Sequence, residues 1–150
     1  MRRNTAGSWR FCLVVSRFNE PVTRSLEEGA RRCLAEAGVA PEHIDVLHVP
    51  GAWELPLAAR LALQRGTYDG IVALGCVIRG ETPHFDYVCL GATTGLEAVA
   101  RESGLPVGFG LLTTNDGEQA YARAGGAKGN KGEEAARAVL EMCEIAARLR

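Results

Sequence analysis

The stretch GIVALGCVIRGETPHFDY, residues 70–87, joins the most apolar run of the chain to a cluster of polar and charged side chains. Its first part, residues 70–77, is almost continuously apolar, which is typical of a β-strand buried on both faces of a parallel sheet. Its second part supplies arginine, glutamate, histidine and aspartate side chains, which can exchange protons or hold an anion. The sequence therefore predicts a central strand here, with a functional site where that strand ends.

The rest of the chain repeats this alternation of strand and helix. Short apolar runs predict three more strands, over residues 10–16, 44–49 and 106–113. Helical spacing of apolar residues predicts helices over residues 22–37, 53–64, 84–102 and 117–124 and, after a glycine-rich loop at 125–132, over 136–147. Such alternation implies right-handed crossovers, a parallel sheet and helices on both of its faces.

We therefore predict a single domain over residues 1–150 with one α/β architecture. It is a three-layer sandwich whose four-stranded parallel sheet has helices on both faces. Residues 1–9 are mostly polar, and we expect them to form a flexible amino-terminal arm.

The composition excludes several classes of protein. A formal net charge of −1 gives no electrostatic footprint for nucleic acid, and no apolar run reaches the roughly 18 consecutive residues of a membrane span. No signal peptide pattern follows the first residues, so a cytoplasmic protein is expected. The five cysteines are scattered without a C-x-x-C pair, which argues against a zinc site or a disulfide framework, and the three histidines form no metal-binding set. We expect the cysteines to be reduced and to pack as small hydrophobic residues.

The ends of the predicted strands are the places to look for a site. In an open parallel sheet, ligands bind outside the carboxyl ends of the strands. The residues that follow the strands are Arg17, Phe18 and Asn19; Pro50, Gly51, Ala52, Trp53 and Glu54; residues 78–84; and Thr113, Thr114 and Asn115. Phe109 lies within the last strand between two glycines, so its ring is expected to be unobstructed.

Each of these residues also has a purely structural interpretation. Phe18 or Trp53 can simply cover the end of the sheet, and Glu81 suits the positive end of a helix without any chemistry. His84 can cap a helix or sit in the core, while His43 and His48 are interpreted as surface residues. The convergence of so many such residues at one edge favours a site over these alternatives.

The type of site follows partly by elimination. The start of the helix near His84 offers backbone N–H groups that suit a phosphate, but G-x-G-x-x-G is absent and GGAKGNKG lacks the P-loop order. No Ser-His-Asp or Cys-His signature is present. What remains is a proton-transfer histidine, a phosphate pocket, cations at Arg123, Lys128 and Lys131, and flat aromatic surfaces. This set describes an enzyme that joins a planar heterocycle to a small phosphorylated compound.

Six blocks of sequence together resemble the lumazine synthase family in order and spacing. They are SRFNE (16–20), VPGAWELP (49–56), ALGCVIRGETPHFDYVC (73–89), FGLLTT (109–114), RAGGAKGNKG (123–132) and EAA…LEM (134–142). The resemblance implies a flavodoxin-like sandwich and the penultimate step of riboflavin biosynthesis. In that step 5-amino-6-ribitylamino-2,4(1H,3H)-pyrimidinedione condenses with 3,4-dihydroxy-2-butanone 4-phosphate to give 6,7-dimethyl-8-ribityllumazine, phosphate and water, with no metal or organic cofactor.

The resemblance also implies a role for each matching residue. Phe18 stacks on the pyrimidinedione with Asn19 beside it, residues 51–54 hold the ribityl chain, and Val77 and Ile78 contact the heterocycle through their backbone. Glu81 and Thr82 form a backbone cradle for phosphate, and His84 is the acid/base catalyst. Three further residues reach into the site from the neighbouring subunit, namely Phe109, Arg123 and Lys131.

The assembly implied by the resemblance is a pentamer, or a 60-subunit shell of pentamers, with active sites between adjacent subunits. An association with riboflavin synthase is a further expectation. The short polar amino terminus weakens the case for a shell, whereas the compact loop at 123–132 favours one. Ala52 stands where many members carry serine, and Glu81 places a carboxylate near the phosphate site.

Two rival functions stay open at this level. One is a riboflavin synthase of the archaeal type, which consumes two lumazines; VPGAWELP and GGAKGNKG argue against it. The other is a carrier or shell protein without activity, which would need neither His84 nor Arg123.

Overall fold

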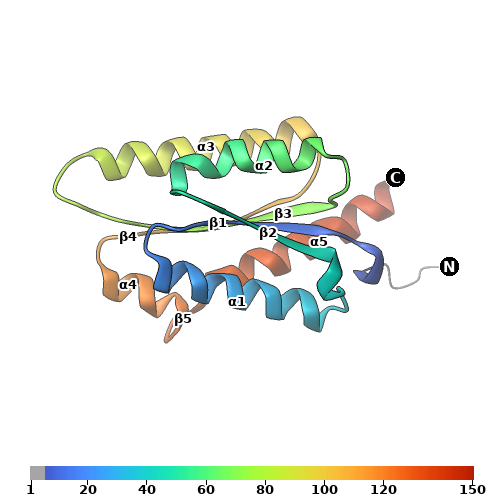
Figure 1. Cartoon of the computed structure of the whole chain (residues 1–150), viewed down its shortest axis with the longest axis horizontal. Coiled ribbons are helices and arrows are strands. Elements are labelled where there is room, and N and C mark those ends of the chain that lie inside the picture. Colours follow the sequence, from blue (N-terminus) through green and yellow to red (C-terminus); the bar gives the residue numbers. More distant parts are fainter. Residues whose placement is uncertain (1–5) are drawn as a thin grey trace.

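A computed structural model describes residues 6–150 and contains one central parallel sheet. Its strands are β1 (Phe11–Ser16), β2 (Ile44–Val49), β3 (Gly70–Ile78) and β4 (Val107–Thr114), in the spatial order β2-β1-β3-β4 (Figure 1). All three strand pairs are parallel. The predicted four-stranded parallel sheet is therefore confirmed.

Helices cover both faces of this sheet. Helices α2 (Leu55–Gln64) and α3 (His84–Ser103) lie on one face, while α1 (Glu20–Glu36), α4 (Gly117–Ala122) and α5 (Lys131–Leu149) lie on the other (Figure 1). The core is accordingly split into two hydrophobic clusters. Alternate residues of β1 enter different clusters: Leu13 packs towards α1 and α5, and Val14 packs towards α2 and α3. This two-sided burial explains the continuous apolar runs, and the result is a flavodoxin-like α/β sandwich.

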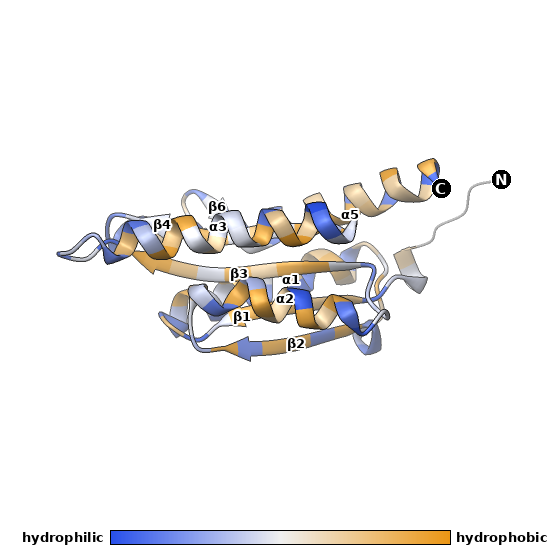
Figure 2. Cartoon of the chain, turned by 90° about the horizontal axis from the view of Figure 1, so that it is seen from above, coloured by the Kyte–Doolittle hydropathy of each residue, from blue (hydrophilic) through white to orange (hydrophobic). Residues whose placement is uncertain are grey.

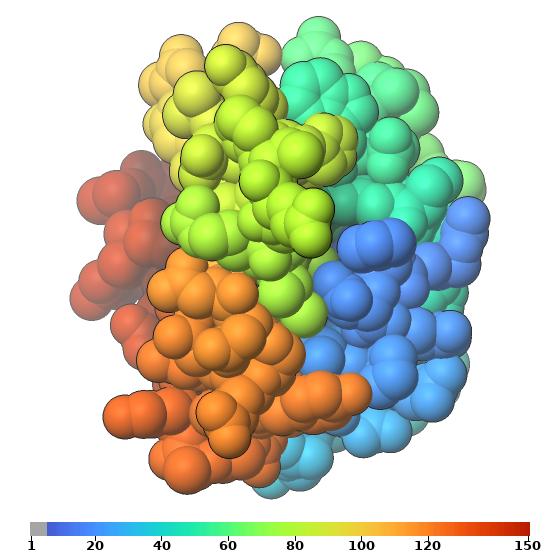
Figure 3. All heavy atoms as spheres, turned by 90° about the vertical axis from the view of Figure 1, so that its left-hand side faces the viewer, coloured from blue at the N-terminus to red at the C-terminus, as the bar shows by residue number. Residues whose placement is uncertain are grey.

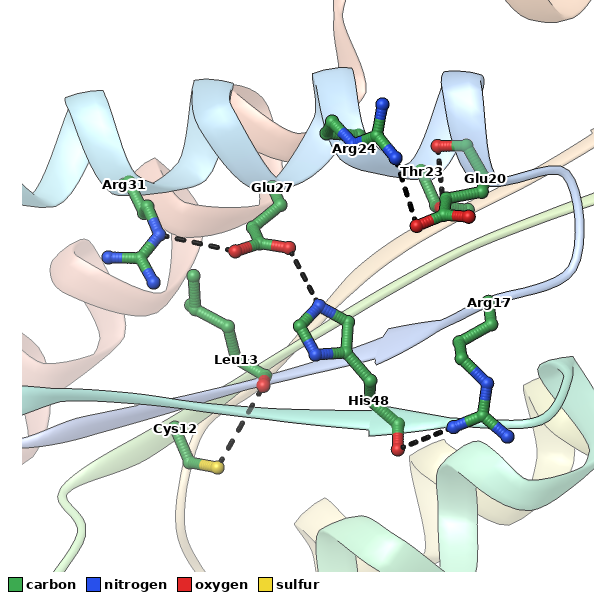
Figure 4. A network of polar contacts seen from close by, with 9 residues as sticks. All are labelled: Cys12, Leu13, Arg17, Glu20, Thr23, Arg24, Glu27, Arg31 and His48. Carbon is green, nitrogen blue, oxygen red and sulfur yellow. Dashed lines mark hydrogen bonds and ion pairs between the residues drawn. The ribbon is translucent and has the colours of Figure 1, made fainter.

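Strand β2 lies at the edge of the sheet and differs from the buried strands. Its residues alternate between half-buried and exposed over most of its length. The hydropathy colours of Figure 2 show hydrophilic residues between hydrophobic ones along the same strand. His48 is exposed as predicted, and its Nε2 lies 3.1 Å from Glu27 Oε1 on α1 (Figure 4). The Arg17 guanidinium donates to the His48 carbonyl at 3.3 Å, so polar contacts hold this edge strand to α1 and to the end of β1. His43, also predicted at the surface, is instead half-buried, with its Nδ1 shielded from solvent.

Some local elements differ from the sequence-based expectations. The helix expected at residue 53 starts as a single 3₁₀ turn, Ala52–Glu54, before α2 begins at Leu55 with Pro56 in its first turn. Helix α4 ends at Ala122, earlier than expected. The glycine-rich loop that follows is a small antiparallel hairpin, β5 (Ala124–Gly126) and β6 (Gly129–Asn130). Gly125 and Gly129 both have positive φ angles, 107° and 86°, which glycine adopts without strain.

Residues 1–5 of the predicted amino-terminal arm lie outside the described residues. Ala6–Ser8 form a short 3₁₀ turn, and Ala6 is buried. The Trp9 ring meets the Phe11 ring edge-on at 6.4 Å between centroids. Ala6 and Trp9 therefore pack against the core beside the start of β1.

Helices α1 and α5 approach each other closely at Gly132. A Cβ atom at this position would lie 2.8 Å from the Leu26 carbonyl carbon and still nearer to its oxygen. Beside it, the buried Asn130 side chain caps α5 by accepting the Glu133 N–H at 3.0 Å, and its Nδ2 donates to the Ser25 carbonyl at 3.1 Å. The start of α5 is thus fixed against α1 by backbone contact and by one amide side chain.

All five cysteines are free thiols, and four of them are buried. Burial raises the pKa values of Cys12 and Cys76 to about 11, so both thiols are neutral at physiological pH. Within residues 6–150, no helix is long and apolar enough to cross a bilayer. Over the same range, no group of three or more His, Cys, Asp or Glu side chains is placed to hold a metal ion.

Candidate active site

The segments that follow the strands meet at one end of the molecule. Figure 3 shows this end, where the loop before α3 lies beside the segment after β2 and the turn after β1, with the α4 region below it. A cavity of about 760 Å³ opens here. Its lining includes most of the residues predicted from the sequence, namely Phe18, Gly51, Ala52, Trp53, Glu54, Val77, Ile78, Thr82 and His84. The expectation that these strand ends converge is therefore met by the geometry.

The turn after β1 presents the Phe18 ring to this cavity. Asn19 has a left-handed backbone conformation with φ 64°, which asparagine tolerates better than most residues. Its Nδ2 donates to the Cys76 carbonyl on β3 at 3.0 Å. Asn19 itself is not part of the lining, so it anchors the turn while 68% of Phe18 stays exposed for a ligand.

The segment after β2 supplies an aromatic ring and a carboxylate. One oxygen of Glu54, Oε1, accepts the Gly51 N–H at 2.9 Å, which closes residues 51–54 into a compact turn. The other oxygen, Oε2, makes no hydrogen bond to the described residues and is free to accept one from a ligand hydroxyl. Trp53 is 61% exposed at the cavity wall.

The indole of Trp53 lies directly on helix α3 at Gly91. A Cβ atom at Gly91 would lie 2.9 Å from Trp53 Cε3 and closer to the neighbouring ring carbon. A few residues along, Pro56 occupies the equivalent space at Gly95, with its Cγ 2.7 Å from a Cβ there. Two glycines on α3 thus let the segment after β2 settle against the helix.

We expect Gly91→Ala to displace the Trp53 indole and to lower the free energy of unfolding by about 1–3 kcal/mol, because the added methyl overpacks this contact. Tryptophan fluorescence measured in a Trp9→Phe background reports the displacement, since Trp53 is then the remaining tryptophan. The matched control is the same substitution in a Trp53→Ala background, where the loss should vanish because alanine also suits a helix better than glycine. An equal loss in both backgrounds would show that Gly91 does not act through the indole.

The loop between β3 and α3 forms the remaining wall. Residues 79–84 are all exposed, and Gly80, Thr82 and His84 line the cavity. His84 is the first residue of α3, where backbone N–H groups have no partner within the helix and can bind an anion. Glu81 is exposed and does not line the cavity.

Sequence reasoning missed several wall residues of this cavity. Phe85, Tyr87 and Val88 come from the first turn of α3, and Cys76 comes from β3. Tyr87 and Val88 follow His84 at helical spacing on the same face, a signal that was present in the sequence. The Cys76 thiol is neutral because burial raises its pKa to about 11, so it adds an apolar patch to the wall.

Three predicted residues lie in a different cavity of the same chain. Phe109, Arg123 and Lys131 line a hollow of about 430 Å³ beside β4 and α4, together with Lys128. The Phe109 ring is 41% exposed, and Arg123 Nη1 donates to the Gln119 carbonyl at 3.0 Å. The chain therefore has two separate cavities. One is lined by aromatic rings and His84, and the other by Arg123, two lysines and the Phe109 ring.

Comparison with known proteins gives concordant matches over nearly the whole chain. Residues 8–147 match the family described as 6,7-dimethyl-8-ribityllumazine synthase. Proteins of that name from Salinibacter ruber and Gemmatimonas aurantiaca are 51% identical over 140 residues and 55% identical over 136 residues. These alignments span 93% and 91% of this chain, and 90% and 83% of the relatives. The protein of the same name from Pediococcus pentosaceus is 48% identical over 136 residues, which is 91% of this chain and 87% of the relative.

Proposed function

Because the chain belongs to the 6,7-dimethyl-8-ribityllumazine synthase family, we propose that its two cavities are the two halves of an active site completed between adjacent subunits. The enzyme forms 6,7-dimethyl-8-ribityllumazine by a condensation in riboflavin biosynthesis. Its substrates are 5-amino-6-ribitylamino-2,4(1H,3H)-pyrimidinedione and 3,4-dihydroxy-2-butanone 4-phosphate, and phosphate and water leave. The observation that carries the two-half proposal is that His84 and Arg123 line different cavities of one chain.

The larger cavity suits the pyrimidinedione and its ribityl chain. The exposed Phe18 ring stacks on the planar heterocycle, which also contacts the backbone of Val77 and Ile78. The turn at 51–54 binds the ribityl hydroxyls, with the free oxygen of Glu54 as an acceptor. Ala52 has no side-chain hydroxyl, but its backbone N–H can donate a hydrogen bond to the ribityl chain and its carbonyl can accept one.

The loop between β3 and α3 binds the phosphorylated substrate. Backbone N–H groups at Glu81 and Thr82 and at the start of α3 meet the phosphate, which is favoured at the positive end of a helix. Arg123 and Lys131 of the neighbouring subunit add cations, and the arginine fork matches phosphate oxygens. Phe109 of that subunit closes over the heterocycle.

His84 carries protons through the reaction. The amine of the pyrimidinedione attacks the ketone, and loss of water gives an imine. Phosphate is then eliminated, and ring closure releases a second water. Each of these steps moves a proton, which one imidazole within reach of both substrates can accept and return. No step requires a metal or an organic cofactor. Holding both substrates in one orientation supplies much of the remaining acceleration.

The proposed assembly is a ring. Every subunit contributes its cavity with His84 to the active site shared with one neighbour, and its cavity with Arg123 to the active site shared with the other. A head-to-tail contact of this kind closes into a cyclic oligomer, for which we propose a pentamer. A 60-subunit shell, an association with riboflavin synthase and a cytoplasmic location are further parts of the proposal.

The direct test is an assay of the purified protein with both substrates in the presence of a metal chelator. We expect one phosphate to be released for each lumazine formed, with lumazine followed by its absorbance. The His84→Ala variant should slow the formation of both products by about 10²–10⁴-fold, the range of general acid–base catalysis. A Glu97→Gln variant on the far end of α3 serves as a control for surface substitution. Riboflavin appearing from lumazine alone, with no product from the two substrates, would contradict the proposal in favour of a riboflavin synthase.

A further inference from the structure

Arg79, the first residue after β3, makes side-chain contacts that the proposed mechanism does not use. Its Nε donates to Asn115 Oδ1 at 2.9 Å, beyond the end of β4. Its Cζ lies 4.5 Å from the centroid of the Phe85 ring, and its Nη1 lies 3.5 Å from Asp86 Oδ1, both in the first turn of α3. The guanidinium thus connects the end of β4 to the start of α3.

The loop spanned by these contacts is otherwise held at its ends by backbone hydrogen bonds, from the Arg79 N–H to the Thr114 carbonyl at 2.8 Å and from the Asp86 N–H to the Pro83 carbonyl at 2.9 Å. Residues 80–83 are exposed, and the side-chain hydrogen bond found among them within the described chain is that of Thr82. Its Oγ1 accepts from the His84 N–H at the start of α3, with a long distance of 3.4 Å between nitrogen and oxygen. Yet Gly80, Thr82 and His84 all line the larger cavity. The position of these residues therefore depends on how the two ends of the loop are fixed.

Asn115 extends the connection to the second cavity. Its backbone N–H donates to Gln119 Oε1 at 2.8 Å, and the Gln119 carbonyl accepts Arg123 Nη1 at 3.0 Å. Gln119 and Arg123 both line the cationic cavity. A continuous run of polar contacts, Arg79–Asn115–Gln119–Arg123, therefore joins the two half-sites of one chain.

We propose that Arg79 and Asn115 are positioning residues for lumazine formation: together they clamp the loop that carries Thr82 and His84. The inference rests on the proposed function of that loop. The clamp needs the planar guanidinium, because one group both stacks on Phe85 and donates to Asn115. The ion pair with Asp86 is half exposed on the arginine side, so it contributes little by itself. The geometry assigns the main effect to the Asn115 hydrogen bond and the ring contact.

The kinetic test uses Arg79→Met and Asn115→Leu, which remove the two sides of the clamp. We expect each variant to lower kcat for lumazine formation by about 10-fold to 100-fold, because misplacement of a catalytic group by about 1 Å costs that much. The double variant should be no slower than the slower single variant, because the two changes break one contact. Asn115→Asp keeps an acceptor oxygen and should retain most of the activity, whereas Arg79→Lys keeps the charge without the fork and should not.

The matched control is Arg101→Met, which removes an exposed arginine near the other end of α3 that is paired with Glu97. A structural readout that needs no activity is amide hydrogen exchange at the two ends of the loop, at residues 79, 86 and 87, whose N–H groups are hydrogen-bonded to the Thr114 and Pro83 carbonyls. Exchange in Arg79→Met is expected to be about 10-fold faster there and unchanged in the strands, because only the loop opens more often.

The two readouts separate the clamp from the function it serves. Lumazine formation by the unmutated enzyme together with an Arg79→Met kcat equal to that of Arg101→Met would overturn the inference. If the unmutated enzyme formed no lumazine, the proposed function would fail, and exchange alone would decide: faster exchange in the loop supports the clamp, and unchanged exchange overturns it.

Discussion

Lumazine formation is expected to return to about a quarter of the unmutated level when His84→Ala protein and Arg123→Ala protein are mixed under conditions in which subunits exchange. Random assembly in a ring pairs an intact histidine with an intact arginine in about one pocket in four. Each variant alone should be slower than the unmutated enzyme by about 10²-fold or more. One lacks the proton carrier, and the other lacks a cation that binds the phosphate. The physical basis is that His84 and Arg123 line separate cavities of the same chain.

The measurement is product absorbance against time before and after exchange, at equal total protein. The control mixes the unmutated protein with a His84→Ala/Arg123→Ala double variant. Exchange should lower its activity from about one half to about one quarter of the unmutated level, because a pocket is then intact only where two unmutated chains meet. A mixture of the single variants that stays at the mean of the two separate rates would show that the site lies within one subunit.

The second large effect concerns the contact of α1 with α5. We expect Gly132→Ala to lower the free energy of unfolding by about 1–3 kcal/mol or more, a large share of the roughly 5–15 kcal/mol that holds a domain together. The added methyl would meet the backbone carbonyl of Leu26, which cannot rotate away as a side chain can. Both helices would therefore have to separate, and the Asn130 hydrogen bonds beside the contact would lengthen.

Urea unfolding at one fixed protein concentration measures this loss, because assembly makes the midpoint depend on concentration. Gly117→Ala is the matched control: a Cβ there meets no atom within 4 Å, and its φ is not positive. An unchanged midpoint for Gly132→Ala would show that the helices do not approach as closely as described.

The sheet and its helices were predictable from the sequence because burial leaves a direct trace in the residues. A strand covered on both faces must be apolar throughout, as residues 70–77 are, and alternation with helices leaves a parallel sheet as the consistent topology. The start of α3 at His84 was also predicted, since the polar loop ends there. The β5–β6 hairpin was missed because its two short strands consist mostly of glycine and small residues, which carry no alternating pattern.

The site was predictable in part for a similar reason. Strand ends are located by the strands themselves, so the residues after β1, β2 and β3 could be grouped before the fold was known. The contact of Arg79 with Asn115 could not, because it joins residues 36 positions apart. It depends on the register of β3 and β4, which places Ile78 beside Thr114. Apolar patterns specify which residues face the core, but not how far one strand is shifted along the next.

The separation of the two cavities has a consequence for a newly made chain. Each chain folds around its own complete core, yet on the proposed arrangement it holds two unfinished pockets and cannot turn over substrate alone. Folding and the gain of catalytic activity then become distinct events. Folding depends on the single chain, whereas activity depends on the concentration of chains in the cell. The rate of lumazine formation then rises more steeply than the concentration of the chain while few rings have assembled. It becomes proportional to that concentration once nearly every chain is part of a ring.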